Sequence, residues 1–348
     1  MESQNEHRRR VRYSGTHPRH YSEKYKELQP EKYGDTIEKV IRKGKTPAGM
    51  HISICVQEIL DILKIQPGQI GLDATLGYGG HTLAMLKCLN LQGHIYGLDI
   101  DPVESEKTRK RLEDLGYGPE ILTVIHSNFS QIDAISSQHG PFHFVLADLG
   151  VSSMQIDNPE RGFSYKFDGP LDLRLNPQQG ITAARRLETI SQDELEGMLL
   201  ENSDEPYARE IARAIISTRK KGCPIETTAK LRQAIEKALS SLPAATQKEA
   251  VKKSCARTFQ ALRIDINHEF EVLYQFLEKL PHTLAPGGRV AILTFHSGED
   301  RLVKQSFKEY KKAGLYAAIA DEVIRPGARE CALNSRAKSA KLRWAVRG

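Results

Sequence analysis

The chain has 348 residues, of which 39% are hydrophobic and 27% charged, and its formal net charge is +6. This length allows one large domain with an insertion or two modest domains. No hydrophobic run approaches the ~20 residues of a membrane-spanning helix, so we expect no association with a membrane.

Residues 1–48 form a polar, basic arm with interleaved tyrosines, and basic residues gather again near the C-terminus. Such an arm could bind nucleic acid through phosphates and stacked bases, or pack against the core as a strap. The five cysteines are scattered and never form a Cys-x-x-Cys pair, which is typical of a reducing compartment and disfavours structural zinc. The start of the chain lacks an apolar secretory signal and contains several acidic residues, so we expect a cytoplasmic protein.

A helix is expected over residues 54–63, and a short strand from Ile70 to Asp73 then leads into a glycine-rich turn. The glycines at 77, 79 and 80 let the backbone approach a ligand closely, and the N-terminus of the next helix offers free N–H groups. A second strand, His94–Asp99, ends in a carboxylate 20 residues after Gly79 (99 − 79). Nucleotide-binding α/β folds place an acid on ribose hydroxyls at this spacing, so the stretch predicts a cofactor site.

Two features of the turn distinguish the candidate cofactors. Thr82 stands where a dinucleotide-binding fingerprint has its third glycine, and Asp73 would repel a pyrophosphate. The same carboxylate could suit a cofactor with an ammonium and a sulfonium group. We therefore favour S-adenosylmethionine over NAD, and the remaining alternative is a core turn without a ligand.

Further strands are predicted at Ile121–Ile125 and Phe142–Ala147, with a helix over Lys107–Leu115 before them. Strands that alternate with helices indicate a parallel, doubly wound sheet, in which ligands bind beyond the carboxyl ends of the strands. The segments expected to converge there are residues 77–81, Asp99, Asn128-Phe129 and Asp148.

A loop of Gly, Pro and charged residues follows, over residues 157–174, and we interpret it as a lid over the substrate. Strand signals are then absent from Thr182 to about Cys255, which predicts an all-helical insertion with helices over 183–189, 193–200, 207–219 and 228–240. Its basic side chains could contact RNA phosphates or face solvent; they are Arg209, Arg213, Arg219, Lys220 and Lys221.

The core is expected to resume with one helix over Thr258–Leu280. The sequence Pro286-Gly287-Gly288 predicts a turn into a strand over Arg289–Phe295, which is followed by His296. Weaker strand signals at residues 315–319 and 342–346 would complete the sheet.

Several motifs then stand in one order. They are Asp73-Ala-Thr-Leu-Gly-Tyr-Gly-Gly-His81, Asp148-Leu-Gly-Val-Ser-Ser153, Glu160-Arg-Gly-Phe-Ser164, Asp168-Gly-Pro-Leu-Asp172, Arg257-Thr-Phe-Gln-Ala-Leu-Arg263, Phe295-His-Ser-Gly-Glu-Asp-Arg301 and Asn334-Ser-Arg-Ala-Lys-Ser-Ala-Lys-Leu-Arg343. With them the chain resembles, from about His51 onward, the RsmH (MraW) family, which methylates N4 of a decoding-centre cytosine in 16S ribosomal RNA.

The resemblance implies an α/β fold: a class I (Rossmann-like) methyltransferase with a doubly wound seven-stranded sheet and an inserted all-helical subdomain. The expected division is an arm at 1–48, a core at 49–155 and 256–348, and a lid loop with helical insertion at 156–255. S-adenosylmethionine would be the methyl donor, and the small ribosomal subunit with its 16S RNA the partner; a homodimer is compatible with the sequence. The implied cofactor-binding residues are Gly79, Gly80, His81, Asp99, Phe129, Asp148 and Gln155.

The chain departs from the family pattern at two motifs. Ser254-Cys255-Ala256 replaces the family's His-Pro-Ala, and Gly298 replaces its usual Leu. Together with the extra arm, these changes suggest a paralogous second copy that acts at the same or another RNA site.

Methylation of an exocyclic amine needs a group that orients the amine and accepts its proton. We assign this role to Asp148, with Ser152 and Ser153 as auxiliary hydrogen-bonding groups; the alternative is that Asp148 only holds the cofactor. Asp172, Arg174 and His296 are candidates for substrate contact, or else structural ion pairs and caps. An NAD-dependent oxidoreductase and a non-catalytic ribosome-assembly factor remain as alternative functions.

Overall fold

The computed structural model describes residues 53–348, apart from the side chain of Ser153. The predicted basic arm at 1–48 lies outside the described residues. Among those that are described, none of the helices has the length and apolar character that a membrane crossing requires.

Seven strands form one sheet in the order β3-β2-β1-β4-β5-β7-β6, in which β7 runs antiparallel to both its neighbours and the others are parallel. The chain moves outward from β1 to β3 and then returns to β4 beside β1, so the order reverses there. A crevice for ligands forms at such a reversal. The strands are β1 (Ile70–Asp73), β2 (His94–Asp99), β3 (Leu122–His126), β4 (Phe142–Asp148), β5 (Leu284–Thr294), β6 (Tyr316–Ile319) and β7 (Lys341–Arg347).

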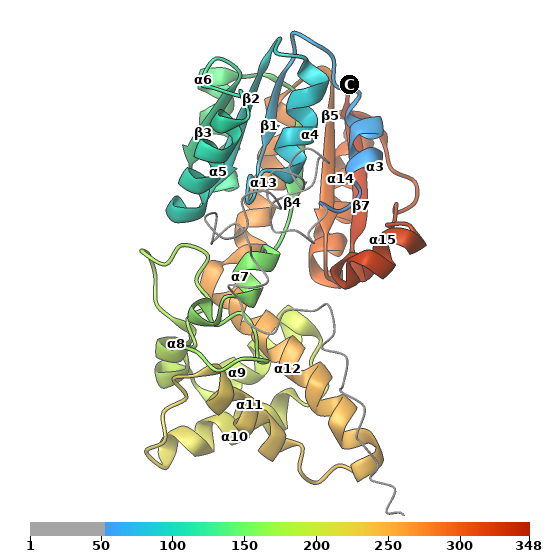
Figure 1. Cartoon of the computed structure of the whole chain (residues 1–348). Helices are drawn as coiled ribbons and strands as arrows, with labels where there is room; N and C mark the ends of the chain where they lie inside the picture. The colour runs from blue at the N-terminus through green and yellow to red at the C-terminus, as the bar shows by residue number, and fades with distance from the viewer. Residues whose placement is uncertain (1–52) are drawn as a thin grey trace, which may run out of the picture.

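Helices cover both faces of the sheet (Figure 1). On one face pack α3 (Val56–Leu63), α4 (Gly80–Leu89) and α5 (Pro102–Asp114). On the other pack α6 (Ile132–His139), α13 (Glu269–Thr283) and α14 (Ser297–Lys312). The predicted doubly wound seven-stranded sheet is therefore confirmed, although α6 and α14 were not predicted. Shorter helices are η2 (Phe129–Gln131), α7 (Ser153–Asp157), η3 (Pro159–Arg161), α15 (Ala328–Leu333) and η4 (Ser335–Ser339).

Between β4 and β5 the chain forms a helical body beyond the carboxyl ends of the strands (Figure 1). It has a hydrophobic core of its own, to which Ile211 and Leu231 contribute. Because Leu171 and Leu173 belong to the same core, the predicted lid loop is part of this body. Its helices are α8 (Ala183–Thr189), α9 (Gln192–Ser203), α10 (Ala208–Lys220), α11 (Thr228–Ala238) and α12 (Ala244–Asn267).

The prediction of one continuous helix over Thr258–Leu280 is wrong, because two helices occupy this region. His268, with a φ of 50°, takes a left-handed conformation that ends α12 and starts α13 in a new direction. The predicted boundary at 255/256 also falls inside α12, which runs from the helical body to the cavity described below.

The other element that differs is β5, which begins at Leu284 rather than Arg289. The Pro-Gly-Gly stretch predicted as a turn lies inside the strand, where the pairing with β4 shifts register between Phe142 and Phe144. Gly287 has a left-handed φ of 73° there, so the predicted turn is present as a bulge within β5.

Candidate active site

A cavity of about 880 Å³ lies at the carboxyl ends of β1, β2 and β4, with its far wall formed by the helical body. The reversal of strand order places it there. The predicted site residues that line it are Gly79, Gly80, His81, Asp99, Phe129, Asp148, Ser152, Gln155 and His296.

The glycine-rich turn forms one edge of the cavity. Gly79 precedes α4 with a φ of 72°, and a Cβ at this position would lie 2.8 Å from Thr108 Cγ2, so glycine is required. Gly77 donates its N–H to Asp99 Oδ2 (2.8 Å), and its carbonyl accepts from Thr108 Oγ1 (2.7 Å). The turn is thus held while Gly80, in the first turn of α4, faces the cavity.

Asp99 ends β2 and lines the cavity beside this turn. Its Oδ1 accepts from the Asp101 N–H at 2.8 Å, and burial raises the pKa of its carboxyl to about 6. Each carboxylate oxygen keeps a second lone pair, so Asp99 can still accept hydrogen bonds from two ribose hydroxyls.

Asp73 does not face the cavity, contrary to expectation. It is 1% exposed; its Oδ2 accepts from Thr82 Oγ1 at 2.6 Å and its Oδ1 from the Thr75 N–H at 3.1 Å. The two departures from a dinucleotide fingerprint, an acid on β1 and a threonine for the third glycine, are therefore partners in one buried hydrogen bond.

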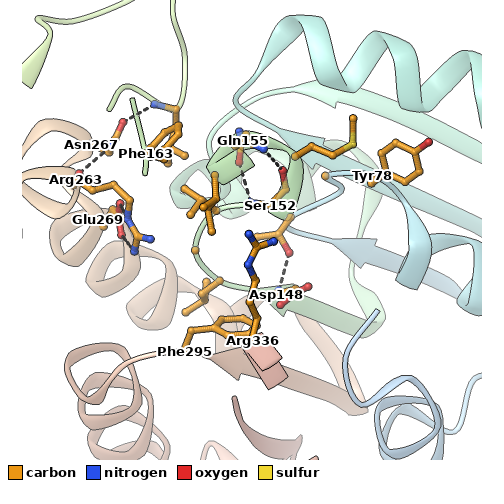
Figure 2. A pocket seen from close by; sticks show the side chains of 18 of the residues that line it. Tyr78, Asp148, Ser152, Gln155, Phe163, Arg263, Asn267, Glu269, Phe295 and Arg336 are labelled. Atoms are coloured by element: carbon orange, nitrogen blue, oxygen red, sulfur yellow. Dashed lines mark hydrogen bonds and ion pairs between the residues drawn. The ribbon is translucent and has the colours of Figure 1, made fainter. Parts of the chain in front are cut away.

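Asp148 ends β4 at the centre of the cavity lining (Figure 2). Its Oδ2 lies 3.4 Å from His81 Nδ1, whereas its Oδ1 is buried without a hydrogen-bond partner among the described residues. Burial raises the pKa of this carboxyl to about 6, and 30% of the side chain remains accessible. An unsatisfied buried acceptor indicates a position that a ligand completes.

Ser152 and Gln155 are linked to each other at the start of α7. Gln155 N–H donates to Ser152 Oγ (3.1 Å), and the Ser152 N–H donates to Gln155 Oε1 (2.9 Å), which forms a capping box. The capping box gives Ser152 a structural role. Both residues also line the cavity, and a chemical role of Ser152 stays a prediction. The side chain of Ser153 lies outside what the structure describes.

Two predicted substrate contacts do not line the cavity. Arg174 pairs with Asp172 through Nε (2.7 Å) and Nη2 (2.8 Å), and this ion pair shapes the loop. In the helical body, Arg219 Nη1 donates to the carbonyls of Leu187 and Ile190, both at 2.8 Å, so this nitrogen has a structural role and a phosphate contact of Arg219 stays a prediction. The other basic candidates, Arg209, Arg213, Lys220 and Lys221, are exposed.

His296 lines the cavity but is held by its own helix. Its Nδ1 accepts from the Glu299 N–H at 3.4 Å, and its Nε2 lies 3.0 Å from Glu299 Oε1. The side chain therefore caps α14, which favours the structural alternative.

Sequence reasoning missed several residues that line the cavity (Figure 2). Arg263 binds both carboxylate oxygens of Glu269 (2.7 and 2.8 Å), and Asn267, one helical turn after Arg263, holds the loop through the Leu173 carbonyl (2.8 Å). Arg336 donates to Asp157 (3.2 Å), and its Nη1 is buried with no partner among the described residues. Both arginines lie in motifs that carry the family resemblance, which was the available signal.

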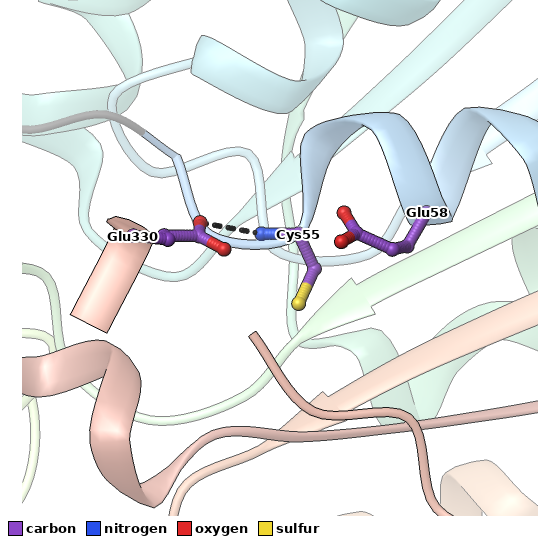
Figure 3. Close-up of side chains that lie close together, drawn as sticks. All are labelled: Cys55, Glu58 and Glu330. Carbon is purple, nitrogen blue, oxygen red and sulfur yellow. Dashed lines mark hydrogen bonds between the residues drawn. The ribbon is translucent and has the colours of Figure 1, made fainter. Parts of the chain in front are cut away.

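Two groups of side chains in the described part of the chain have a spacing compatible with a metal ion. In the group formed by Cys55, Glu58 and Glu330, the Cys55 N–H donates to Glu330 Oε1 at 2.9 Å (Figure 3). Burial raises the pKa of the Cys55 thiol to about 12, so the thiolate that a metal needs is disfavoured. In the second group, Glu269, His296 and Glu299, Arg263 already neutralises Glu269. We assign neither as a metal site.

Comparison with known proteins agrees with this geometry. The chain is 68% identical to "Ribosomal RNA small subunit methyltransferase H 1" of Lachnoclostridium phytofermentans, over 98% of this chain and 93% of that one. It is 67% identical to "Ribosomal RNA small subunit methyltransferase H 2" of Alkaliphilus metalliredigens, over 97% of each. The numbered names of both relatives fit the paralogous copy suggested by the sequence.

A solved structure of a putative rRNA-methylase from Clostridium thermocellum matches 85% of this chain and 97% of its own, with 13% identity and a TM-score of 0.41, too distant to inform the function. The model of the MraW methylase family matches residues 48–347. This match decides against the NAD-dependent oxidoreductase, and the chain belongs to the MraW methylase family.

Proposed function

We propose that this protein transfers a methyl group from S-adenosylmethionine to N4 of a cytosine in the decoding centre of 16S ribosomal RNA. The observation that carries the proposal is the carboxyl of Asp148, which lines the cavity and whose Oδ1 is buried without a hydrogen-bond partner among the described residues. Membership in a methylase family and the names of the close relatives support the reaction and the ribosomal RNA.

The residues at the cofactor edge fit S-adenosylmethionine. Asp99 would accept the ribose hydroxyls, and the N–H groups of the first turn of α4, at Gly80 and His81, would bind its carboxylate. Phe129 and Gln155 complete this edge. When bound, the cofactor supplies an electrophilic methyl group attached to a sulfonium.

Asp148 supplies the hydrogen-bond and proton acceptor that the amine requires. As the N4–carbon bond forms, the carbon–sulfur bond breaks with its electron pair left on sulfur, and N4 must lose one proton. Asp148 Oδ1 can orient the amine by accepting a hydrogen bond and then take that proton. Ser152 and Ser153 remain auxiliary candidates.

The far wall is suited to a nucleotide that has left its stack. A cytosine in folded RNA has to be splayed out before its amine can reach Asp148. The cavity offers Phe163 and Phe259 as apolar surfaces, and Arg336, whose Nη1 has no partner among the described residues, carries a donor for a phosphate.

The departures at the two family motifs lie outside the cavity. Ser254 is buried and donates to Glu205 Oε1 at 2.8 Å, and Cys255 belongs to the hydrophobic core of the helical body. At Gly298, a Cβ would lie 2.6 Å from Phe270 Cζ. Because none of the three lines the cavity, these changes favour the family's own target over a shifted RNA site.

The test has two parts. N4-methylcytidine is mapped in small-subunit RNA from cells that lack all other members of this family, with and without the gene, and its unchanged presence at the decoding-centre cytosine would refute the proposed target. In vitro, Asp148→Asn should lower methyl transfer to small subunits by at least ~100-fold while S-adenosylhomocysteine still binds. Asp133→Asn, a remote surface change, is the matched control. Parallel loss of cofactor binding in Asp148→Asn would leave Asp148 a cofactor ligand instead.

A further inference from the structure

His81 is placed between two groups that together determine its protonation. It lies in the first turn of α4 and is 7% exposed. Its Nε2 is 2.9 Å from the carbonyl oxygen of Ile54, and its Nδ1 is 3.4 Å from Asp148 Oδ2. His81 and Asp148 both line the cavity.

The first contact assigns one proton. A peptide carbonyl can only accept a hydrogen bond, so the hydrogen must be on Nε2 of His81. A neutral ring would then turn the bare lone pair of Nδ1 toward the carboxylate of Asp148. Two acceptors facing each other repel, whereas a second proton on either atom would make the 3.4 Å contact between Nδ1 and Oδ2 attractive.

We infer that His81 is a positioning residue that shares one proton with Asp148 between Nδ1 and Oδ2, and thereby reserves Oδ1 for the amine of the substrate. This inference rests on the proposed role of Asp148 as the proton acceptor. It gives the side chain of His81 a function separate from the backbone N–H that we assign to the cofactor.

The surroundings of the pair favour retention of this proton. The ionisable groups that face Asp148 are Asp73 on β1 and Glu299 on α14, both acidic, and the thiol of Cys55 before α3. A pair without the shared proton would add another negative charge to these carboxylates. Burial further disfavours a lone carboxylate, and it raises the pKa of Asp148 to about 6.

The shared proton also balances the charge of the reaction. Methyl transfer removes the positive charge from sulfur and releases one proton from N4. If Oδ1 takes that proton, the pair changes from neutral to singly positive, so the total charge of the site is constant. This reduces the electrostatic cost of the step in a buried cavity.

The ring nitrogens can be observed directly in the full-length protein without ligands. With ¹⁵N-labelled histidine, the His81 signals are those that disappear in His81→Asn. We expect both ring nitrogens to carry or share a proton at neutral pH in the wild type, and Nδ1 to become bare in Asp148→Asn, with no change in Asp133→Asn. A bare Nδ1 in the wild type would overturn the inference, and because no RNA is needed, that result would leave the proposed function standing.

Kinetics separate positioning from a merely structural role. His81→Leu removes the donor and should lower kcat by on the order of 100-fold, with a much smaller effect on the Kd of S-adenosylhomocysteine. His81→Asn keeps an N–H near the position of Nδ1 and should recover most of kcat. If His81→Asn is no better than His81→Leu while both variants are equally stable, His81 only anchors α4 to Ile54.

Discussion

At the scale of single residues, Asp73 and Thr82 show how one buried hydrogen bond makes the glycine-rich turn differ from that of a dinucleotide-binding protein. Asp73 stands at the end of β1, where the pyrophosphate of a dinucleotide would require an uncharged residue. Thr82 occupies the position of the third glycine in the dinucleotide fingerprint. Their 2.6 Å contact satisfies a buried carboxylate and fixes α4 to β1.

Thr82→Val should therefore destabilise the protein. It removes the hydroxyl without changing the shape of the side chain and leaves Asp73 Oδ2 buried without that donor, which costs about 1–3 kcal/mol. Denaturant unfolding monitored by circular dichroism measures the loss. Thr189→Val, at an exposed position, is the control, and equal stabilities of the two variants would contradict this account.

The activity should depend on pH through Asp148. Burial raises the pKa of its carboxyl to about 6, and only the ionised form can accept the amine proton at Oδ1. The value of kcat should therefore fall as the pH drops through about 6 and rise toward neutral pH. Single-turnover methylation over this range checks the prediction, and a rate that is constant through the acidic range would exclude Asp148 as the acceptor.

At the scale of elements, the loop between α7 and α8 is tied both to the sheet domain and to the helical body. Arg161 Nη1 donates to Asp101 Oδ2 at 2.7 Å, and its Nη2 donates to the carbonyls of Arg174 and Leu175. Leu171 N–H donates to the Glu226 carbonyl at 2.8 Å. These contacts join the loop, which is one wall of the cavity, to both the cofactor edge and the helical body.

Arg161→Gln tests this connection. Asp101 is fully buried, so removal of its guanidinium partner leaves an uncompensated charge, and we expect a loss of about 3 kcal/mol in the free energy of unfolding. Chemical denaturation gives the value. Arg185→Gln, which breaks an exposed ion pair, should change stability by less than about 1 kcal/mol, and a similarly small effect of Arg161→Gln would refute the connection.

At the scale of the whole molecule, cofactor and stability are linked. S-adenosylhomocysteine at about 100 times its Kd should add about 2.7 kcal/mol to the free energy of unfolding, because it binds only the folded cavity. Thermal unfolding should show a corresponding rise in Tm, whereas NAD at the same concentration should leave Tm unchanged. A Tm that responds to NAD but not to S-adenosylhomocysteine would overturn the cofactor assignment.

The sequence by itself determined the strands, their alternation with helices, and the glycine turn followed by Asp99 and Asp148 at strand ends. These features depend on local periodicity and on the rule that parallel strands present their carboxyl ends at one edge. The family motifs added the identity of the chemistry.

Only the tertiary structure decided which of these side chains face the cavity and which residues join them from afar. Asp73 points into a hydrogen bond with Thr82, and Arg336 comes from the C-terminal segment to the wall near Asp148. Likewise, a single left-handed residue, His268, directs α12 toward the helical body and α13 toward the sheet. Side-chain direction and long-range contact follow from the packing of whole elements, which no local pattern of residues contains.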